Sequence, residues 1–322
     1  MKEITFNSIE GMKIGNSQKL NGPTGCTVLV FEEGAPAGVD VRGGSPGTRE
    51  TDLLNPVNLV DKIHAVVLAG GSAFGLDAAG GVMQYLEEKS IGFDVSVTKV
   101  PIVCGAVLFD LNIGNFRVRP DKAMGYEACK NSELNLCKNG NVGAGAGATV
   151  GKILGNEHAM KGGLGTFAIQ IGELKVGAVV AVNCLGDVID SKNHRIIAGA
   201  LNEDGKSFAG TEKVMLERYS EKKNLFSGNT TIGAVVTNGN FTKTQMNKIA
   251  SMAHNGYGRA IRPAHSMFDG DTIFAASCGK VEADLSVVGF LAAEVMEKAI
   301  VRAVKSADSI LEYKSYKDLK YV

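Results

Sequence analysis

The segment Gly228-Asn-Thr-Thr-Ile-Gly-Ala-Val-Val-Thr237 is the most informative about the fold, because a polar stretch ends here and an apolar, β-branched run begins. Such a run predicts a buried strand that starts at Thr230. If the bond between Asn229 and Thr230 were cut, this strand would begin with a free α-amine. An α-amine has an unperturbed pKa of about 7.7–8.0, so it can serve as a base for the hydroxyl of its own residue. The Asn229-Thr230 pair alone does not indicate cleavage, since loops often enter strands at Asn-Thr pairs.

Strand-like and helix-like segments alternate on both sides of this run. Apolar runs predict strands at 26–31, 64–69, 107–111 and 272–276, and a hairpin of 166–171 with 175–183 around Gly172-Glu173. Helices are predicted over 76–88, over about 286–306, and from an N-cap at Thr242, with Gln245 as its capping-box partner, to Gly256. The polar stretches 120–147 and 202–229 are predicted to be irregular surface segments. The pattern predicts a single domain, 1–322, of mixed α and β structure with helices covering buried sheets.

The composition fits a folded enzyme-sized chain. Of 322 residues, 44% are hydrophobic and 21% are charged, which excludes global disorder. The 34 basic residues balance 34 acidic ones, which argues against nucleic acid or an anionic membrane as the main partner. We expect no signal peptide and no membrane span, because no apolar run is long enough. The six cysteines form no CxxC pair, which predicts reduced thiols in a cytoplasmic protein.

Two glycine-rich segments match catalytic loops only in part. Gly143-Ala-Gly-Ala-Gly-Ala-Thr-Val-Gly-Lys152 lacks the first Gly and the final Ser/Thr of a phosphate-binding loop, so we interpret it as a closely approached backbone loop. Gly70-Gly-Ser-Ala-Phe-Gly75 has Phe74 where a nucleophile elbow has its last Gly. Nothing selects a triad of Ser72 with Asp187 and His194 or His265. We therefore predict a structural role for Ser72, with its hydroxyl capping the helix that follows.

Other polar residues lie near predicted strand ends. Asp269 and Asp271 are one residue apart at the entry to the strand 272–276, so both would face one side, where they could hold an ammonium group. A solvated turn that binds nothing is the alternative. Asn183 ends a predicted strand and could donate to an oxyanion, or only cap the strand. The five histidines have no metal-site spacing and are interpreted as structural, with His265, four residues before Asp269, the least settled.

Taken together, these pieces resemble the DmpA-type aminopeptidase family, which contains L-aminopeptidase/D-esterase/amidases, β-peptidyl aminopeptidases and nylon-oligomer hydrolases. The matching segments come in family order and span roughly residues 22 to 290. They are Thr24-Gly-Cys-Thr-Val28, Val41-Arg-Gly-Gly-Ser-Pro-Gly-Thr-Arg-Glu-Thr51, Leu68-Ala-Gly-Gly-Ser-Ala-Phe-Gly-Leu-Asp-Ala78, Val100-Pro-Ile-Val103, Phe109-Asp-Leu111, Gly140-Asn-Val-Gly-Ala-Gly145, Asn229-Thr-Thr-Ile232, Arg259-Ala-Ile-Arg-Pro263 and Asp269-Gly-Asp-Thr-Ile-Phe274.

The resemblance implies a four-layer αββα sandwich of the N-terminal-nucleophile hydrolase type and self-cleavage into an α-chain, 1–229, and a β-chain, 230–322. Thr230 would be the nucleophile, where several relatives have Ser. Asn183 matches the family's oxyanion donor, and Asp269 and Asp271 match the pair that orients the new amine. Lys152 matches a lysine near the nucleophile in the nylon-hydrolase branch.

The same resemblance implies hydrolysis of amide bonds without a metal or cofactor, in a homo-oligomer. The substrate would be a small peptide or amino-acid amide, and α-peptides, β-peptides, D-amino acid amides and 6-aminohexanoate oligomers all stay open. The Asn229-Thr-Thr and Asp-Gly-Asp patterns favour the nylon-hydrolase branch. Phe109 stands where some members have Tyr, and Cys104 replaces a common Pro. An N-acyltransferase of the ornithine acetyltransferase type, which has Ala before its threonine, and an uncut binding protein are the alternatives.

Overall fold

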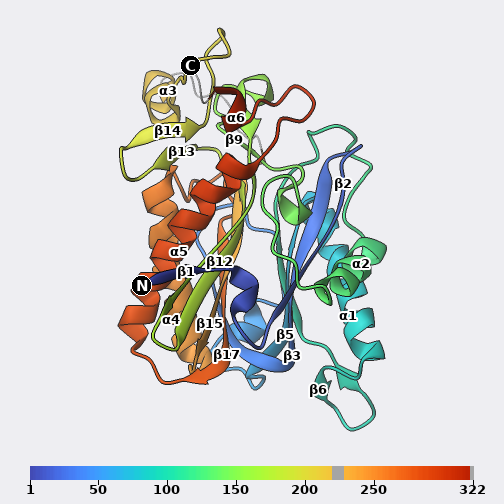
Figure 1. Ribbon diagram of the computed structural model, residues 1–322. Helices are drawn as coiled ribbons and strands as arrows, with labels where there is room; N and C mark the ends of the chain where they lie inside the picture. Colours follow the sequence, from blue (N-terminus) through green and yellow to red (C-terminus); the bar gives the residue numbers. More distant parts are fainter. Residues whose placement is uncertain (220–227, 320–322) are drawn as a thin grey trace.

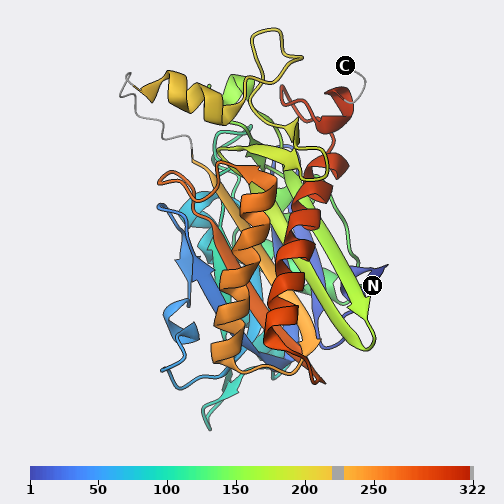
Figure 2. The ribbon, with the colours of Figure 1, turned by 90° about the vertical axis from the view of Figure 1, so that its left-hand side faces the viewer.

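The structure, a computed structural model, describes residues 1–219 and 228–319. Four layers follow one another across the molecule: helices α4 (Lys243–Ala260) and α5 (Leu285–Ser306), two stacked sheets, and helices α1 (Ala78–Glu88) and α2 (Lys122–Ser132) (Figure 1). In the turned view, α4 in orange and α5 in red run side by side over the face of the first sheet (Figure 2). The predicted αββα sandwich is confirmed.

The first sheet has the strand order β1 (Lys2–Ile4), β11 (Gly163–Ile171), β12 (Leu174–Asn183), β15 (Thr230–Gly239), β17 (Thr272–Val281) and β3 (Thr24–Val41). The second sheet is built on β3 as well, with β2 (Lys13–Lys19) on one side and β5 (Lys62–Ala69), β8 (Val103–Val107) and β4 (Thr48–Arg49) on the other. Thus one strand belongs to both sheets.

The strand β3 joins the two layers because its halves pair differently. Its residues 26–30 pair with β5, the register shifts between Val30 and Ala35, and residues 37–41 pair with β17. A register shift of this kind bends a strand and increases its twist. The bend lets the ten strands form two stacked layers.

Alternation along β15 divides the core into two parts. Ile232, Ala234 and Val236 pack between the two sheets, whereas Val235 packs against the helices α4 and α5. A period of two in a strand buried on both faces gives this arrangement. A third cluster, which includes Val28 and Val67, lies between the second sheet and the helices α1 and α2.

The shorter elements complete the chain. They are β6 (Phe93–Asp94), β7 (Lys99–Val100), β9 (Thr149–Val150), β10 (Met160–Lys161), β13 (Asp187–Asp190), β14 (Arg195–Ala198), α3 (Thr211–Glu217), β16 (Ile261–Arg262) and α6 (Tyr316–Leu319). Among the described residues, no helix is both long enough and apolar enough to cross a membrane.

Most predicted elements are present, and the hairpin and the capping box at Thr242 are confirmed. Several boundaries were wrong. The strands expected at 26–31 and 272–276 extend over 24–41 and 272–281, as β3 and β17. The strand expected at 107–111 is β8, which ends at Val107. The helix from Thr242 passes Gly256 and ends at Ala260, because Gly256 packs so close to α5 that a Cβ there would lie 2.5 Å from the Ala293 carbonyl oxygen. The helix α1 starts at Ala78, after a 3-10 turn over Ser72–Asp77.

The irregular stretches also contain helices that the polar composition concealed. Within 120–147, α2 begins after Asp121, whose carboxylate accepts a hydrogen bond from the Met124 backbone nitrogen. Its buried face, which includes Ala128, packs on the second sheet. Within 202–229, α3 is described, whereas 220–227 lie outside the described residues.

Three strand ends meet around Thr230. Thr230 is the first residue of β15, as predicted, and pairs with Asn183, the last residue of the antiparallel strand β12. On its other side β15 runs parallel to β17, with Ile232 opposite Thr272. The segment that holds Asp269 and Asp271 leads directly into β17. The fold therefore gathers residues from 183, 230 and 269–271 at one end of the first sheet.

Candidate active site

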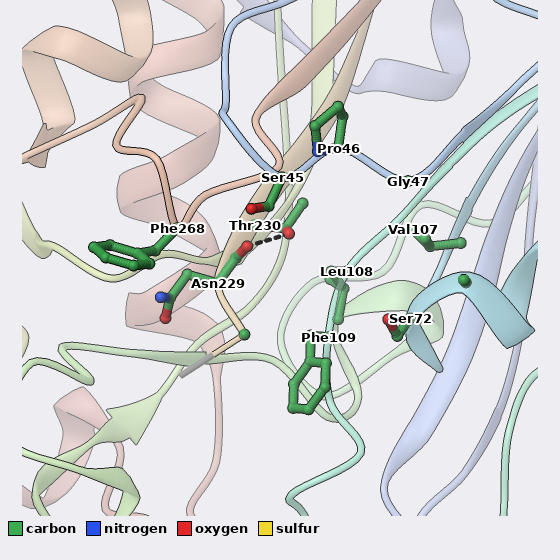
Figure 3. Close-up of a pocket in the computed structure, with 12 residues that line it drawn as sticks. Ser45, Pro46, Gly47, Ser72, Val107, Leu108, Phe109, Asn229, Thr230 and Phe268 are labelled. Carbon is green, nitrogen blue, oxygen red and sulfur yellow. Dashed lines mark hydrogen bonds between the residues drawn. The ribbon is translucent and has the colours of Figure 1, made fainter. Parts of the chain in front are cut away.

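Thr230 is 4% exposed, and its hydroxyl lies beside the peptide bond that precedes it. Its Oγ1 donates a hydrogen bond to the Asn229 carbonyl oxygen (Figure 3). The backbone N–H of Gly270 donates to the same oxygen over 3.2 Å. Two donors on one carbonyl oxygen draw electron density from the carbonyl carbon, which makes that carbon more open to attack by a nucleophile.

The residue before Asn229 is a glycine for a steric reason. Gly228 has φ 61°, and a Cβ there would lie 2.3 Å from the Phe109 ring. Only glycine combines this left-handed backbone with so close a contact. Phe109, which stands where some members of the resembled family have Tyr, thus contributes a ring that supports the turn before Thr230.

Asn183 faces Thr230 across the β12–β15 pair, and side chains of directly opposed residues lie on the same face of a sheet. Its Oδ1 accepts from the Thr149 backbone nitrogen at 2.9 Å, and its Nδ2 donates to the Phe109 carbonyl oxygen at 2.9 Å. These two bonds fix the plane of the buried amide. An amide nitrogen carries two hydrogens, so one N–H can serve a further acceptor while the other holds Phe109.

Lys152 is buried beside the same turn. Its Nζ donates to the carbonyl oxygens of Asn183, at 3.0 Å, and of Gly228, at 3.3 Å. Burial lowers the pKa of Lys152 to about 7, against smaller opposing effects of Cys184, Asp269 and Asp110. A neutral amine has two N–H groups for these two carbonyls and a lone pair left to accept a proton.

Asp269 is 1% exposed, so the solvated turn considered from the sequence is excluded. Its Oδ1 accepts from the Leu185 backbone nitrogen at 3.2 Å, and its Oδ2 accepts from the Ser266 backbone nitrogen at 3.1 Å and from the Ser266 hydroxyl. Burial and the neighbouring Asp271 carboxylate raise the pKa of Asp269 to about 6.

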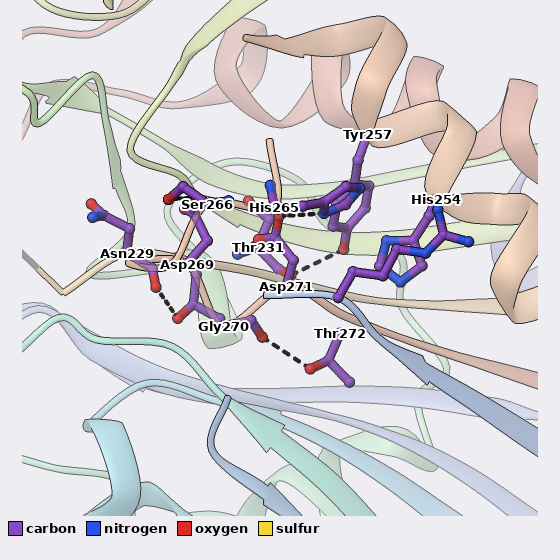
Figure 4. A network of polar contacts seen from close by, with 12 residues as sticks. Asn229, Thr231, His254, Tyr257, His265, Ser266, Asp269, Gly270, Asp271 and Thr272 are labelled. Atoms are coloured by element: carbon purple, nitrogen blue, oxygen red, sulfur yellow. Dashed lines mark hydrogen bonds and ion pairs between the residues drawn. The ribbon is translucent and has the colours of Figure 1, made fainter. Parts of the chain in front are cut away.

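Asp271, also 1% exposed, holds a different segment. Its Oδ1 accepts from the Thr231 backbone nitrogen at 2.8 Å, and its Oδ2 accepts from the backbone nitrogen and Nδ1 of His265 at 3.0 and 2.9 Å (Figure 4). The two carboxylates lie in the turn before β17 rather than on the strand, and they point to different partners. Both orient protein groups around Thr230.

A pocket of about 120 Å³ opens beside Thr230, with Ser72, Leu108 and Phe109 on one side and Asn229 and Phe268 on the other (Figure 3). Among the described residues, its lining carries no charged side chain; it consists of Ser45, Pro46, Gly47, Ser72, Ala73, Val107, Leu108, Phe109, Gly228, Asn229, Thr230 and Phe268. Neither aspartate lines it. The idea that the pair holds a substrate ammonium finds no support in this geometry.

Ser72 belongs to this lining, but the capping role predicted for it was wrong. It sits inside the 3-10 turn with φ 53°, the N-cap of that turn is Gly71, and no side chain caps it. The triad partners also lie elsewhere. Asp187 accepts from Ala200 and Thr211, and His265 donates to Asp271. His194 is exposed in the turn between β13 and β14. The elbow-type triad is therefore not assembled.

Sequence reasoning missed two contributors. The Gly270 N–H on the Asn229 carbonyl is a backbone group, and residue type alone does not reveal where a backbone group points. The bond from His265 to Asp271 was missed as well, although the six-residue spacing kept both in one segment. A histidine followed closely by an Asp-Gly-Asp turn was the available signal.

Comparison with protein families gives one match over most of the chain: the model of peptidase family S58 matches residues 5–317. Among individual proteins, an uncharacterized aminopeptidase of Mycobacterium leprae is 37% identical over 98% of this chain and 93% of its own length. A 6-aminohexanoate-oligomer endohydrolase of a Kocuria strain is 31% identical over 92% of this chain and 84% of its own length.

Solved structures share the fold at low sequence identity. The L-aminopeptidase D-Ala-esterase/amidase of Ochrobactrum anthropi, described as a variant of the N-terminal-nucleophile hydrolase fold, superposes with a TM-score of 0.70 at 17% identity, covering 95% of this chain and 88% of that one. A β-aminopeptidase of a Burkholderia species gives a TM-score of 0.65 at 18% identity, covering 94% and 86% of the two chains.

Proposed function

The chain belongs to peptidase family S58 and is a hydrolase, and we propose that it matures by cutting its own Asn229–Thr230 bond and then hydrolyses amides with Thr230 as nucleophile. One observation carries this proposal. The carbonyl oxygen of Asn229 accepts hydrogen bonds from both the Thr230 hydroxyl and the Gly270 N–H, so the nucleophile and an oxyanion donor converge on one peptide bond. The products would be the chains 1–229 and 230–322.

In the proposed self-cleavage, Thr230 Oγ1 attacks the Asn229 carbonyl carbon and Lys152 accepts the hydroxyl proton. The Gly270 N–H stabilises the oxyanion that forms, an effect worth about 3–4 kcal/mol for one well-placed donor. The C–N bond then breaks as the Thr230 nitrogen takes the proton from Lys152, which leaves an ester between Asn229 and Thr230 and returns Lys152 to its neutral form. Water hydrolyses this ester to a carboxylate on Asn229 and restores the hydroxyl. Thr230 now carries a free amine.

In the proposed turnover, that amine accepts the proton of Thr230 Oγ1 as the oxygen attacks a substrate carbonyl. The second N–H of Asn183 donates to the tetrahedral oxyanion. An acyl-enzyme forms, the amine product leaves, and water hydrolyses the ester. Lys152, Asp269 and Asp271 hold the turn, the flanking strands and Thr231 in place. Each step uses groups of this chain and water.

We propose a small amide or peptide whose acyl residue has an uncharged side chain, because the lining residues that the structure describes beside Thr230 carry no charge. The relatives named as aminopeptidases and as 6-aminohexanoate-oligomer hydrolases support this class. The test is a panel of alanyl, β-alanyl, lysyl and glutamyl p-nitroanilides with aminohexanoate oligomers, assayed on processed protein. Acyl residues with uncharged side chains should give the higher kcat/KM, and a preference for lysyl or glutamyl substrates would contradict the proposal.

Asp271→Asn should slow both self-cleavage and turnover by about ten- to a hundredfold. The carboxylate accepts three hydrogen bonds. In the amide that replaces it, one oxygen becomes an NH₂ group, which is a donor and cannot accept from the N–H groups it faces. Rates would be followed by gel densitometry of the uncut chain and by p-nitroaniline release.

Asp187→Asn provides a matched control for this variant. Asp187 is buried and also accepts from three donors, two on Thr211 and one on Ala200. Both variants should lose a similar amount of unfolding free energy, but only Asp271→Asn should lose rate. Equal losses of rate in the two variants would remove the proposed role of Asp271.

Ser72→Ala should still cut itself and keep turnover within about fivefold of the wild type, because the reacting oxygen belongs to Thr230 and Ser72 contributes one neutral group to the pocket wall. The fraction cut and kcat/KM on the best substrate of the panel decide this. A variant that is folded and fully cut but has no turnover would make Ser72 the nucleophile of the hydrolytic reaction.

We also propose that the protein is a homo-oligomer in the cytoplasm. The resemblance to oligomeric hydrolases supports the homo-oligomer, and six unpaired cysteines support a reducing compartment. Light scattering coupled to size-exclusion chromatography would give the subunit number, and a monomer at micromolar concentration would contradict the proposal.

A further inference from the structure

His265 lies directly behind the carboxylate that holds the residue after Thr230. One oxygen of Asp271 accepts from the Thr231 backbone nitrogen, and the other accepts from both the backbone nitrogen and Nδ1 of His265 (Figure 4). Because a carboxylate only accepts, the imidazole carries a hydrogen on Nδ1. His265 and Thr231 therefore hold Asp271 from its two sides.

The imidazole itself is held in one orientation. Its ring stacks on Tyr257 with 5.8 Å between centroids and 22° between planes, and it meets the His254 ring in a T-shaped contact with 4.8 Å between centroids. Its backbone is left-handed, with φ 61°, a conformation that residues other than glycine adopt rarely. Several independent contacts thus fix the direction of the Nδ1–H bond.

The ring partner of His265 contacts Thr231 as well. The Tyr257 hydroxyl donates to the Thr231 carbonyl oxygen at 3.2 Å, while Asp271 accepts from the Thr231 nitrogen. The Thr231 nitrogen lies in the same rigid peptide plane as the Thr230 carbonyl and Cα. Holding that plane therefore limits the directions in which the Thr230 side chain can point.

We infer that His265 is a positioning residue for the proposed hydrolysis: through Asp271 it holds the peptide plane that orients Thr230. This inference rests on Thr230 being the nucleophile. His265 is absent from the pocket lining, so it acts through Asp271 and has no contact with substrate. Loss of the imidazole donor should therefore lower kcat and the rate of self-cleavage while KM changes little.

Two substitutions separate the donor from the backbone geometry. Asn and Gly both tolerate a left-handed φ, but only Asn offers an N–H to Asp271. In His265→Gly we expect kcat to fall by about ten- to a hundredfold, the factor that one hydrogen bond to a charged group can supply. In His265→Asn we expect kcat within about fivefold of the wild type. Each variant would be checked by circular dichroism and thermal unfolding.

Chemical rescue gives a readout that a purely structural role would not move. The side chain of His265 is 23% exposed, so its removal leaves a site open to small molecules. At pH 8.5, free imidazole should raise kcat of His265→Gly several-fold, whereas 1-methylimidazole, whose neutral form has no N–H, should not. Equal rescue by both compounds, or a His265→Asn variant as slow as His265→Gly, would overturn the inference.

If His265→Gly does not fold, His265→Asp replaces it, because Asp has the shape of Asn and tolerates the same backbone but cannot donate. A large difference in kcat between Asn and Asp supports the inference, and equal values overturn it. Failure of the proposed function looks different. It would appear in the wild type, as a chain that is never cut before Thr230, whatever residue 265 is.

Discussion

Thr230→Ala should give a folded chain that stays uncut and has no hydrolase activity. The substitution removes the Oγ1 that donates to the Asn229 carbonyl. In the proposed mechanism, the same atom attacks this carbonyl and later the substrate. The wild type should yield two fragments of about 24 and 10 kDa, the shares of 33.8 kDa that fall to 229 and 93 residues. Removing one buried hydroxyl leaves the core of β15 intact, so the fold should survive.

Gel electrophoresis and N-terminal sequencing check this result. The small wild-type fragment should read Thr-Thr-Ile-Gly, and Thr230→Ala should show one band after long incubation. Thr230→Ser is the matched control, since it keeps the attacking oxygen and should still be cut. A small fragment that starts at Thr231, or full activity in Thr230→Ala, would refute the assignment of the nucleophile.

Lys152→Met should slow self-cleavage by about a hundredfold to ten-thousandfold, the usual contribution of a general base. Methionine matches the length and burial of the side chain but has no lone pair of suitable basicity. In the wild type, the pKa of about 7 makes the amine neutral above that pH. The rate should therefore rise about tenfold per pH unit below pH 7 and level off above it.

Lys161→Met is the control for burial. Lys161 is also buried, its pKa is also lowered to about 7, and its Nζ donates to the carbonyl oxygens of Gly145, Ala148 and Gly162. It has no bond to Gly228, so its loss should affect stability rather than self-cleavage. A Lys152→Met chain that is cut at the wild-type rate would remove Lys152 from the reaction.

The low pKa of Lys152 also predicts how stability changes with pH. Its pKa in the folded chain lies near 7, below the usual value of 10.5 for a solvated lysine. Between these values the unfolded chain binds more protons, so the contribution of Lys152 to the free energy of unfolding rises with pH from about 7 to 10.5. Lys152→Met should lack this contribution, which denaturant titrations at pH 7 and pH 9.5 would reveal.

The strands of the first sheet were predictable because they carry their signal locally. The hairpin 163–183 and the strand from Thr230 are apolar runs bounded by Gly or polar residues, which sequence periodicity detects. The helix α2 was missed because its residues are largely polar and short-chained. Its one clear signal, Asp121 three residues before Met124, is common outside helices too.

The site could be predicted only as a set of residue types. The pairing of Asn183 with Thr230 depends on the register of two strands far apart in the sequence, and no local pattern fixes that register. The approach of Lys152 to Gly228 depends on how a glycine-rich loop packs. The roles of both residues came from the family resemblance, and the structure adds their partners and their burial.

The place of β15 in the sheet determines how the proposed two-chain form would refold after it unfolds. The segment 230–322 supplies two adjacent strands, β15 and β17, which lie between β12 and β3 of the segment 1–229. Before cleavage, refolding is a first-order event within one chain. After cleavage, two chains must meet, so recovery becomes second-order and slows on dilution. The cut protein would therefore depend on slow unfolding rather than on reversible folding. A molecule that unfolds at low concentration would not refold.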